Sequence, residues 1–106
     1  MNETKLELRK GLIIPPGKLK AFCQLHHIKS LALFGSILHD DFRPDSDIDV
    51  LVEFETGKTP GFFTIAEMED ELSGLFGNRK IDLRTPQDLS HHFRERVMSE
   101  AVVLCR

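Results

Sequence analysis

The stretch LFGSILHDDFRPDSDIDVLVEF, residues 33–54, places two aspartates in a segment that is otherwise typical of a buried strand. Alternate side chains of an extended strand point to opposite faces. The apolar residues at 48, 50, 52 and 54 therefore share one face, and Asp47 and Asp49 lie side by side on the other. Two carboxylates this close repel each other, and burial adds to the cost. The alternative is that this Asp-x-Asp lies in a turn or on a solvated sheet edge.

A divalent cation would remove the repulsion. Carboxylate oxygens suit Mg²⁺ or Mn²⁺, and Mg²⁺ typically binds one or two protein carboxylates together with water and substrate phosphate. Gly35-Ser36 follows an apolar strand, in a turn whose backbone N–H groups can bind a phosphate. Asp82, in KIDLRT, supplies a third carboxylate if its strand is a neighbour. We therefore predict Asp47, Asp49 and Asp82 as catalytic, metal-binding residues and Gly35 and Ser36 as nucleotide-binding residues.

Helical and strand patterns alternate along the chain. Helices are expected at 3–11, 16–27, 62–76 and within 85–101, and strands at 30–34, 47–54 and 80–85, with a last strand at 102–105. Thr64 and Glu67 have the spacing of a capping box, and Gly77 is expected to end its helix. The alternation predicts an α/β (α+β) fold, a small mixed β-sheet covered by helices. A length of 106 residues predicts one domain, 1–106.

Composition and charge exclude several partners. The net charge of −3 argues against adhesion to nucleic acid or acidic lipid, which depends on a cationic surface. The chain has no Trp or Tyr to stack on bases, so no direct nucleic-acid binding is expected. It also has no apolar run near 18 residues and no secretory leader, which predicts a cytoplasmic protein without a membrane span.

The cysteines and histidines carry weaker predictions. Cys23 and Cys105 lie far apart in apolar company, without the spacing of a zinc or redox motif, so we expect buried free thiols. The adjacent pairs at 26–27 and 91–92 are poor joint ligands, because neighbouring residues of a helix point about 100° apart. His39 is open to two interpretations, a solvated surface residue or a cation beside phosphate.

The order and spacing of Gly35-Ser36, Asp47-Ile48-Asp49 and Asp82 resemble a known family. The similarity is to the minimal nucleotidyltransferases of bacteria and archaea, in the DNA polymerase β-like nucleotidyltransferase superfamily. It runs from about residue 31 to 103, and in GNRKIDLRTPQDLSHHFRERVMSEAVVL the residue Asp82 matches the family's third carboxylate. The resemblance implies a polymerase β palm-like fold.

The resemblance also implies a reaction. A nucleoside monophosphate, AMP from ATP, moves to an acceptor, pyrophosphate leaves, and two Mg²⁺ ions stabilise the attacking and leaving oxygens. Asp47 and Asp49 would hold both ions. Asp82 would bind one ion and help to activate the acceptor hydroxyl.

One segment departs from the family pattern. Many relatives carry Arg-x-Arg-Gly after Gly-Ser, where this chain has Ile37, Leu38, His39 and Asp40. Each lost guanidinium contact to a buried phosphate is worth about 1.5–3 kcal/mol. If the protein is a slow or specialised enzyme, arginine at positions 37 and 39 is expected to strengthen ATP binding, because a guanidinium pairs with phosphate oxygens.

The resemblance leaves two hypotheses about function. Family members are commonly encoded beside a helical HEPN-type RNase toxin and act as its antitoxin, some by attaching AMP to it. The intact Gly-Ser and carboxylates favour an enzyme of that kind, whereas the altered segment favours a non-catalytic module that neutralises the partner by contact. A small-molecule transferase is disfavoured, because no second domain supplies an acceptor pocket. A homodimer is left open.

Overall fold

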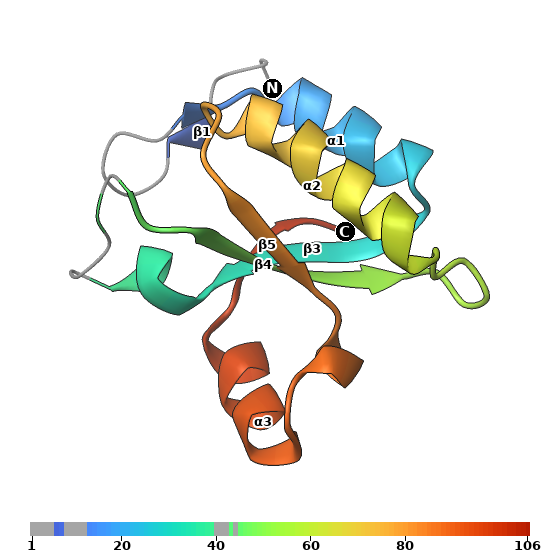
Figure 1. The fold of residues 1–106 in the computed structure, drawn as a ribbon, viewed down its shortest axis with the longest axis vertical. Coiled ribbons are helices and arrows are strands. Elements are labelled where there is room, and N and C mark those ends of the chain that lie inside the picture. The colour runs from blue at the N-terminus through green and yellow to red at the C-terminus, as the bar shows by residue number, and fades with distance from the viewer. Residues whose placement is uncertain (1–5, 8–12, 40–42, 44) are drawn as a thin grey trace.

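The computed structural model describes residues 6–7, 13–39, 43 and 45–106, and its centre is a mixed four-stranded sheet (Figure 1). The sheet strands are β3 (Ile28–Phe34), β4 (Ile48–Phe54), β5 (Ile81–Arg84) and β6 (Val102–Cys105). The helices are α1 (Pro16–Leu25), α2 (Phe62–Leu75) and α3 (His91–Glu100), with short 3-10 turns η2 (Gly35–Leu38) and η3 (Pro86–Asp88). A separate ladder joins β1 (Leu6–Glu7) to β2 (Ile13–Ile14).

The strand order in the sheet is β5-β4-β3-β6. β4 runs antiparallel to β3 and parallel to β5, and β6 runs antiparallel to β3. The predicted mixed sheet covered by helices is therefore confirmed. β4, the strand of the Asp-x-Asp motif, is an interior strand with a partner on each side.

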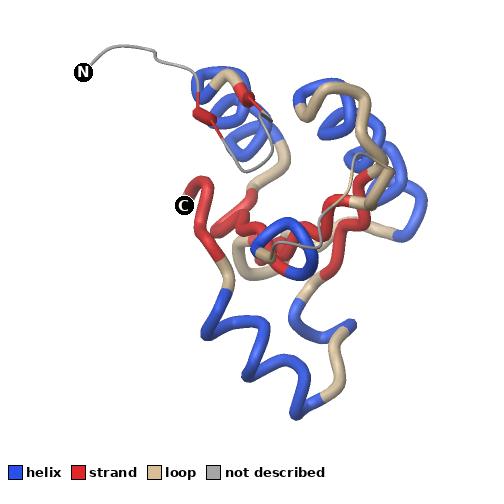
Figure 2. The backbone as a smooth tube through the Cα atoms, turned by 90° about the vertical axis from the view of Figure 1, so that its left-hand side faces the viewer, coloured by secondary structure: helices blue, strands red, loops and turns tan. Residues whose placement is uncertain are grey.

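The two faces of the sheet are covered unequally. α1 and α2 lie next to each other over one face, and α3 lies on the other (Figures 1 and 2). The main core is between the sheet and α1 and α2, and it includes Ile48, Val50 and Val52 from β4. The opposite face has a smaller cluster, made by Phe34, Leu51, Leu89 and Val97. The predicted alternation along β4 is confirmed.

Two predictions of local structure are corrected. Leu6–Glu7 was expected within a helix over 3–11, but it is a strand paired with Ile13–Ile14, and the remainder of that range lies outside the described residues. Isolated helices this short are marginal, so pairing with a second segment prevails. α2 begins after Gly61, before the predicted capping box can act, and no side chain caps it. Gly77 follows the helix with φ of 71°, as a helix-ending glycine should.

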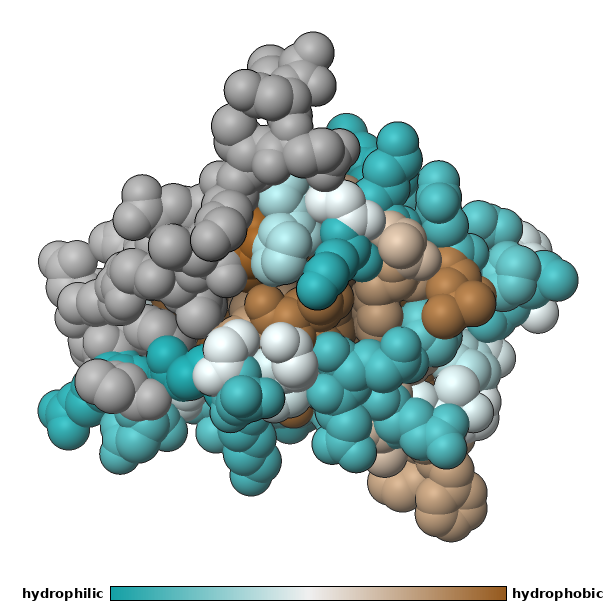
Figure 3. All heavy atoms as spheres, turned by 90° about the horizontal axis from the view of Figure 1, so that it is seen from above, coloured by the Kyte–Doolittle hydropathy of each residue, from teal (hydrophilic) through white to brown (hydrophobic). Residues whose placement is uncertain are grey.

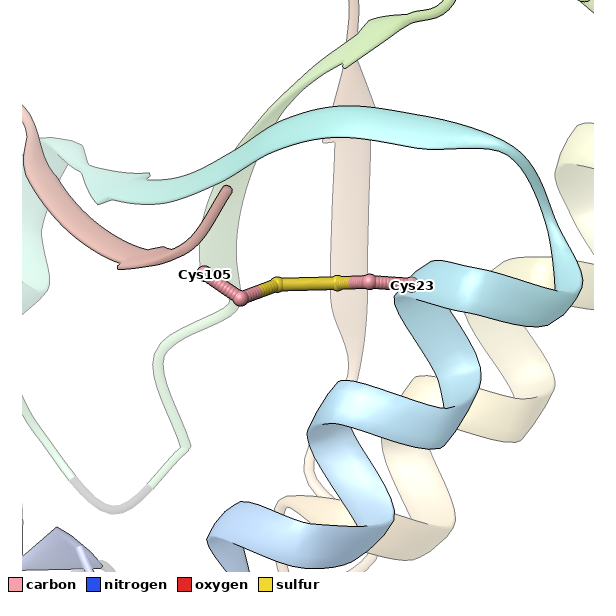
Figure 4. The surroundings of a disulfide bond; sticks show 2 residues. All are labelled: Cys23 and Cys105. Carbon is pink, nitrogen blue, oxygen red and sulfur yellow. A yellow bond between two sulfur atoms is a disulfide. The ribbon is translucent and has the colours of Figure 1, made fainter.

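Cys23 and Cys105 are not free thiols, because a disulfide joins them and links α1 to β6 (Figure 4). Only the burial of Cys23 agrees with the expectation. The pairing was hidden by a sequence separation of 82 residues. It depends on β6 returning to pair with β3 beneath α1.

The surface over α1 and α2 is largely hydrophilic, with apolar groups gathered towards its middle (Figure 3). A groove of about 330 Å³ lies between these helices and is lined in part by Phe22, Leu25 and Leu75. Among the described residues, no helix is long and apolar enough to cross a membrane.

Candidate active site

Asp49 and Asp82 are direct neighbours across the parallel strands β4 and β5. Ile48 and Ile81, which precede them, form the adjacent registered pair and are buried in the main core. The two aspartates therefore point to the other face, where α3 lies. Asp47 precedes β4 and is exposed at the rim of the same face. The structure thus brings the three predicted carboxylates together.

Gly35 and Ser36 lie against Asp49. Gly35 has φ of +79°, and a Cβ at this position would overlap Asp49 Oδ2. Glycine is therefore required twice here, for the backbone conformation and for the close approach of a carboxylate. The backbone N–H of Ser36 lies near enough to Asp49 to lower the pKa of its carboxyl.

The electrostatics of the site centre on Asp49. Burial, followed by the negative charges of Asp82 and Asp47, raises the pKa of Asp49 above its ordinary value of 3.8. Arg84 and the Ser36 N–H oppose this rise. The Asp49 carboxylate is therefore less stable as an anion than a solvated aspartate, and a cation at the site would relieve it.

Sequence reasoning missed two cations, Arg84 at the end of β5 and Lys80 just before it. Arg84 forms a two-pronged ion pair with Asp82, with Nε 3.1 Å from Oδ1 and Nη2 3.3 Å from Oδ2. Lys80 Nζ lies 4.0 Å from Asp47 Oδ2. The signal was present in KIDLRT, since residues at 80, 82 and 84 share one face of an extended segment.

The approach to Asp47 is fastened to the start of β5. Arg79 donates from Nη2 to the carbonyl oxygens of Arg43 at 2.8 Å and Ser46 at 2.7 Å. The backbone N–H of Ile48 donates to the Lys80 carbonyl at 2.8 Å. These bonds fix where the chain enters β4 and therefore where Asp47 lies.

The segment that replaces Arg-x-Arg-Gly does not lie as expected. Ile37 is 1% exposed and belongs to the main core, so its side chain does not face the site and the ground for a gain in ATP binding from arginine there is removed. The reason is that the 3-10 turn η2 directs this side chain into the main core between the sheet and the helices α1 and α2. His39 is exposed, and its backbone N–H donates to the Ser36 carbonyl at 2.9 Å. Asp40 lies outside the described residues.

A cavity of about 610 Å³ adjoins the site beyond β5. Its charged lining residues are Glu69, Asp82, Arg84 and Asp88, and Phe62 and Ile65 of α2 contribute apolar surface. The backbone N–H of Leu83 donates to Glu69 Oε2 at 2.8 Å, so α2 also satisfies part of the β5 edge. The cavity is large enough for a ligand next to Asp82.

The carboxylate oxygens of Asp47, Asp49 and Asp82 are ligands of the type that Mg²⁺ prefers, but they do not form a complete metal site. In the part of the chain that the structure describes, no three His, Cys, Asp or Glu side chains are grouped as a metal site. The three carboxylates nevertheless share one face, close enough that Asp82 and Asp47 raise the pKa of Asp49. Mg²⁺ needs only one or two of them, because water and phosphate complete its shell. Of the three carboxylates, that of Asp82 forms an ion pair with Arg84.

Known proteins are similar to this chain in sequence and in fold. The nucleotidyltransferase domain family matches residues 17–104. A Methanocaldococcus jannaschii protein named "Putative protein adenylyltransferase MJ1379" is 31% identical over 103 residues, which are 97% of this chain and 95% of that protein.

Two solved structures superpose on the chain. One, described as "Structure of putative minimal nucleotidyltransferase", has a TM-score of 0.67 and 32% identity over 82% of this chain and 86% of its own. The other, "Crystal structure of the toxin-antitoxin with AMP-PNP", shares the fold with a TM-score of 0.67 and 20% identity over 85% of this chain and 72% of its own. Sequence and structure agree, and the chain belongs to the minimal nucleotidyltransferases of the nucleotidyltransferase domain family.

Proposed function

We propose that this protein is a Mg²⁺-dependent enzyme that transfers AMP from ATP to a protein partner, and that it acts as the antitoxin of a HEPN-type helical toxin. The observation that carries the proposal is the pairing of Asp49 with Asp82 across β4 and β5, beside the Gly35 turn. The adenylyltransferase name of the relative and the toxin–antitoxin complex with AMP-PNP support the choice of reaction and partner.

In this proposal each part of the site has a task. Asp47 and Asp49 would hold the divalent ion, with Asp82 as a third ligand, and the ion would neutralise charge on the attacking and leaving oxygens. Gly35, which has no side chain, lets the Asp49 carboxylate lie against the turn, and the nucleotide phosphates would bind next to it. Ser36 offers its hydroxyl as a donor.

The transfer forms one bond and breaks one. The acceptor oxygen bonds to the α-phosphorus of ATP while the bond to the bridging oxygen of the β-phosphate breaks, and pyrophosphate leaves with that oxygen. The proton of the acceptor hydroxyl passes to the Asp82 carboxylate.

A second candidate is a module that neutralises the same partner by contact alone. Two observations favour it: Ile37 is part of the core and not of a phosphate site, and Arg84 occupies Asp82. Under this alternative, the carboxylates are dispensable for protection against the toxin.

The deciding experiment combines the protein with labelled ATP, Mg²⁺ and a HEPN-type protein, taken first from the neighbouring gene. We expect the mass of one AMP on the partner and none with the Asp47→Asn/Asp49→Asn protein. Asp70→Asn, an exposed aspartate on α2 and therefore over the opposite face, is the matched control and should transfer AMP normally. If the double variant still neutralises the toxin, and the wild-type reaction adds no mass to the partner, the enzyme hypothesis is rejected.

We also propose that the protein works in the cytoplasm, where ATP is available. Disulfides are uncommon there, so this location implies that Cys23 and Cys105 are reduced in the cell. Rapid alkylation of both thiols when cells are lysed in denaturant, which exposes the buried Cys23, is the expected result. Protection of both cysteines from alkylation would argue against this location.

A further inference from the structure

β5 carries alternating charges on the site face of the sheet. Ile81 and Leu83 are buried in the main core, so Lys80, Asp82 and Arg84 point the other way. The register places Asp82 beside Asp49 and Arg84 beside Leu51. Arg84 therefore lies one step beyond the carboxylate pair, at the wall of the cavity that adjoins Asp82.

The three carboxylates of the site are held in different ways. Both oxygens of Asp82 accept from the Arg84 guanidinium, at 3.1 and 3.3 Å. Asp47 has only a long contact of 4.0 Å to Lys80, whose side chain is 80% exposed. Asp49 lies against the Gly35 turn. A planar fork on both oxygens is the strongest and most directional of these arrangements.

This ion pair competes with a divalent ion. A cation that binds Asp82 needs the oxygens that Arg84 already contacts, and the guanidinium charge would repel it at close range. Metal binding to Asp82 therefore requires the guanidinium to move away. It can move, because the side chain of Arg84 is 47% exposed and faces the cavity.

A triphosphate offers the guanidinium another partner. Arginine binds phosphate oxygens with the same two-pronged geometry that it uses for carboxylates. Positions 37–39, where many relatives carry Arg-x-Arg, supply no arginine here, and Ile37 is in the core. Arg84 is also the cation that acts on Asp49 in this structure.

We propose that Arg84 is a positioning residue that couples metal binding to nucleotide binding: it holds Asp82 in the free protein and releases it when its guanidinium pairs with the phosphates of a nucleoside triphosphate. The inference rests on the proposed function for the presence of a nucleotide in this site. It explains why the carboxylates share one face without forming a metal cage among the described residues.

The test measures metal binding and does not depend on AMP transfer. Mn²⁺ alone, and Mn²⁺ complexed with the non-hydrolysable AMP-PNP, are titrated into wild type and Arg84→Met by calorimetry. For Arg84→Met we expect Mn²⁺ alone to bind about 3- to 10-fold more tightly, since a competing charge is gone, and the complex to bind about 3- to 10-fold more weakly. Arg84→Lys keeps the charge without the fork and should lie between the two.

Two controls separate this role from a general charge effect. Arg96→Met removes an arginine of α3 that is paired with Glu100 at 3.8 Å, and it should change neither titration. In an Asp82→Asn background, Arg84→Met should no longer strengthen binding of Mn²⁺ alone. Circular dichroism establishes that each variant is folded, and Arg84→Gln replaces Arg84→Met if the latter is not.

The outcomes distinguish this inference from the proposed function. Unchanged or weaker binding of Mn²⁺ alone to Arg84→Met would overturn the hold on Asp82. A gain for Mn²⁺ alone without a loss for the complex would overturn the release to phosphate. If wild type does not bind the complex at all, the nucleotide part of the proposed function fails, and with it the coupling. If both titrations behave as expected but no AMP is transferred, the coupling stands and the enzyme hypothesis falls.

Discussion

The two faces of β4 have opposite duties. On one face, Ile48, Val50 and Val52 are fully buried against α1 and α2 in the main core. On the other face, Asp49 lies near the negative charges of Asp82 and Asp47. Leu51 is the β4 residue that belongs to the smaller apolar cluster. Stability is therefore concentrated on one face, and the proposed chemistry on the other. Substitutions on the two faces should change different measured quantities.

The largest effect is expected from a charge on the core side. Ile37→Arg places a guanidinium where the native side chain is 1% exposed, with no described acidic partner in that core. An unpaired buried charge is among the few changes that cost about 4 kcal/mol or more. Urea denaturation should show a large loss of the free energy of unfolding, or no folded protein at all.

His39→Arg is the matched control, because His39 is two residues away and exposed. It should change the free energy of unfolding by less than about 0.5 kcal/mol. Equal stability of the two variants would show that η2 does not direct Ile37 into the core.

The second-largest effect is expected at the Gly35 turn, which lies against the Asp49 carboxylate. Gly35→Ala combines a positive φ with overlap of the new Cβ and the Asp49 carboxylate. We expect a loss of about 1–3 kcal/mol in the free energy of unfolding. Gly57→Ala is the matched control, since Gly57 has φ of +77° but no atom lies within 4 Å of the place that its new methyl group would take. A loss no larger than that of Gly57→Ala would mean that Asp49 does not pack on this turn.

The sequence predicted the site face well because strand alternation is a local property. Ile48, Val50 and Val52 identified the buried face of β4, and the same rule placed Asp82 towards Asp49 once β4 and β5 were neighbours. The Gly35 turn was recognised from Gly-Ser after an apolar strand, and the structure places the Asp49 carboxylate against it where a phosphate was expected. The roles of these residues in metal and nucleotide binding remain predictions.

Features that depend on distant segments could not be predicted from the sequence. The Cys23–Cys105 disulfide requires β6 to return beside β3 beneath α1, and nothing near either cysteine encodes that return. The burial of Ile37 depends on how η2 turns after β3, which a family motif aligned by spacing does not specify. In KIDLRT, strand alternation puts Arg84 on the same face as Asp82, but the ion pair between them became clear only in the structure.

The third effect is on the chemical face and should spare the fold. Asp47→Asn/Asp49→Asn removes two of three like charges and is expected to abolish the stabilisation that Mn²⁺ gives to the melting temperature. Without metal, the free energy of unfolding should be unchanged or higher by less than about 1 kcal/mol, because these groups are partly solvated and the lost repulsion is screened. A clear fall in metal-free stability would show that the aspartates are structural. Asp70→Asn should keep the full response to Mn²⁺.

The smallest effect is a pH dependence carried by Asp49 alone. Its pKa is raised above 3.8 in the folded protein, so the folded state takes up this proton at a higher pH than the unfolded chain does. The folded state therefore gains stability from this group as the pH falls through the raised pKa, and the gain is complete below 3.8. Other carboxylates titrate in the same range, so the measured quantity is the difference in unfolding free energy between wild type and Asp49→Asn in chelator. Wild type should gain on the variant as the solution is acidified from neutral pH. A difference that stays flat, or moves the other way, would mean that Asp49 is not strained as an anion and that its face carries no stored repulsion for a metal to relieve.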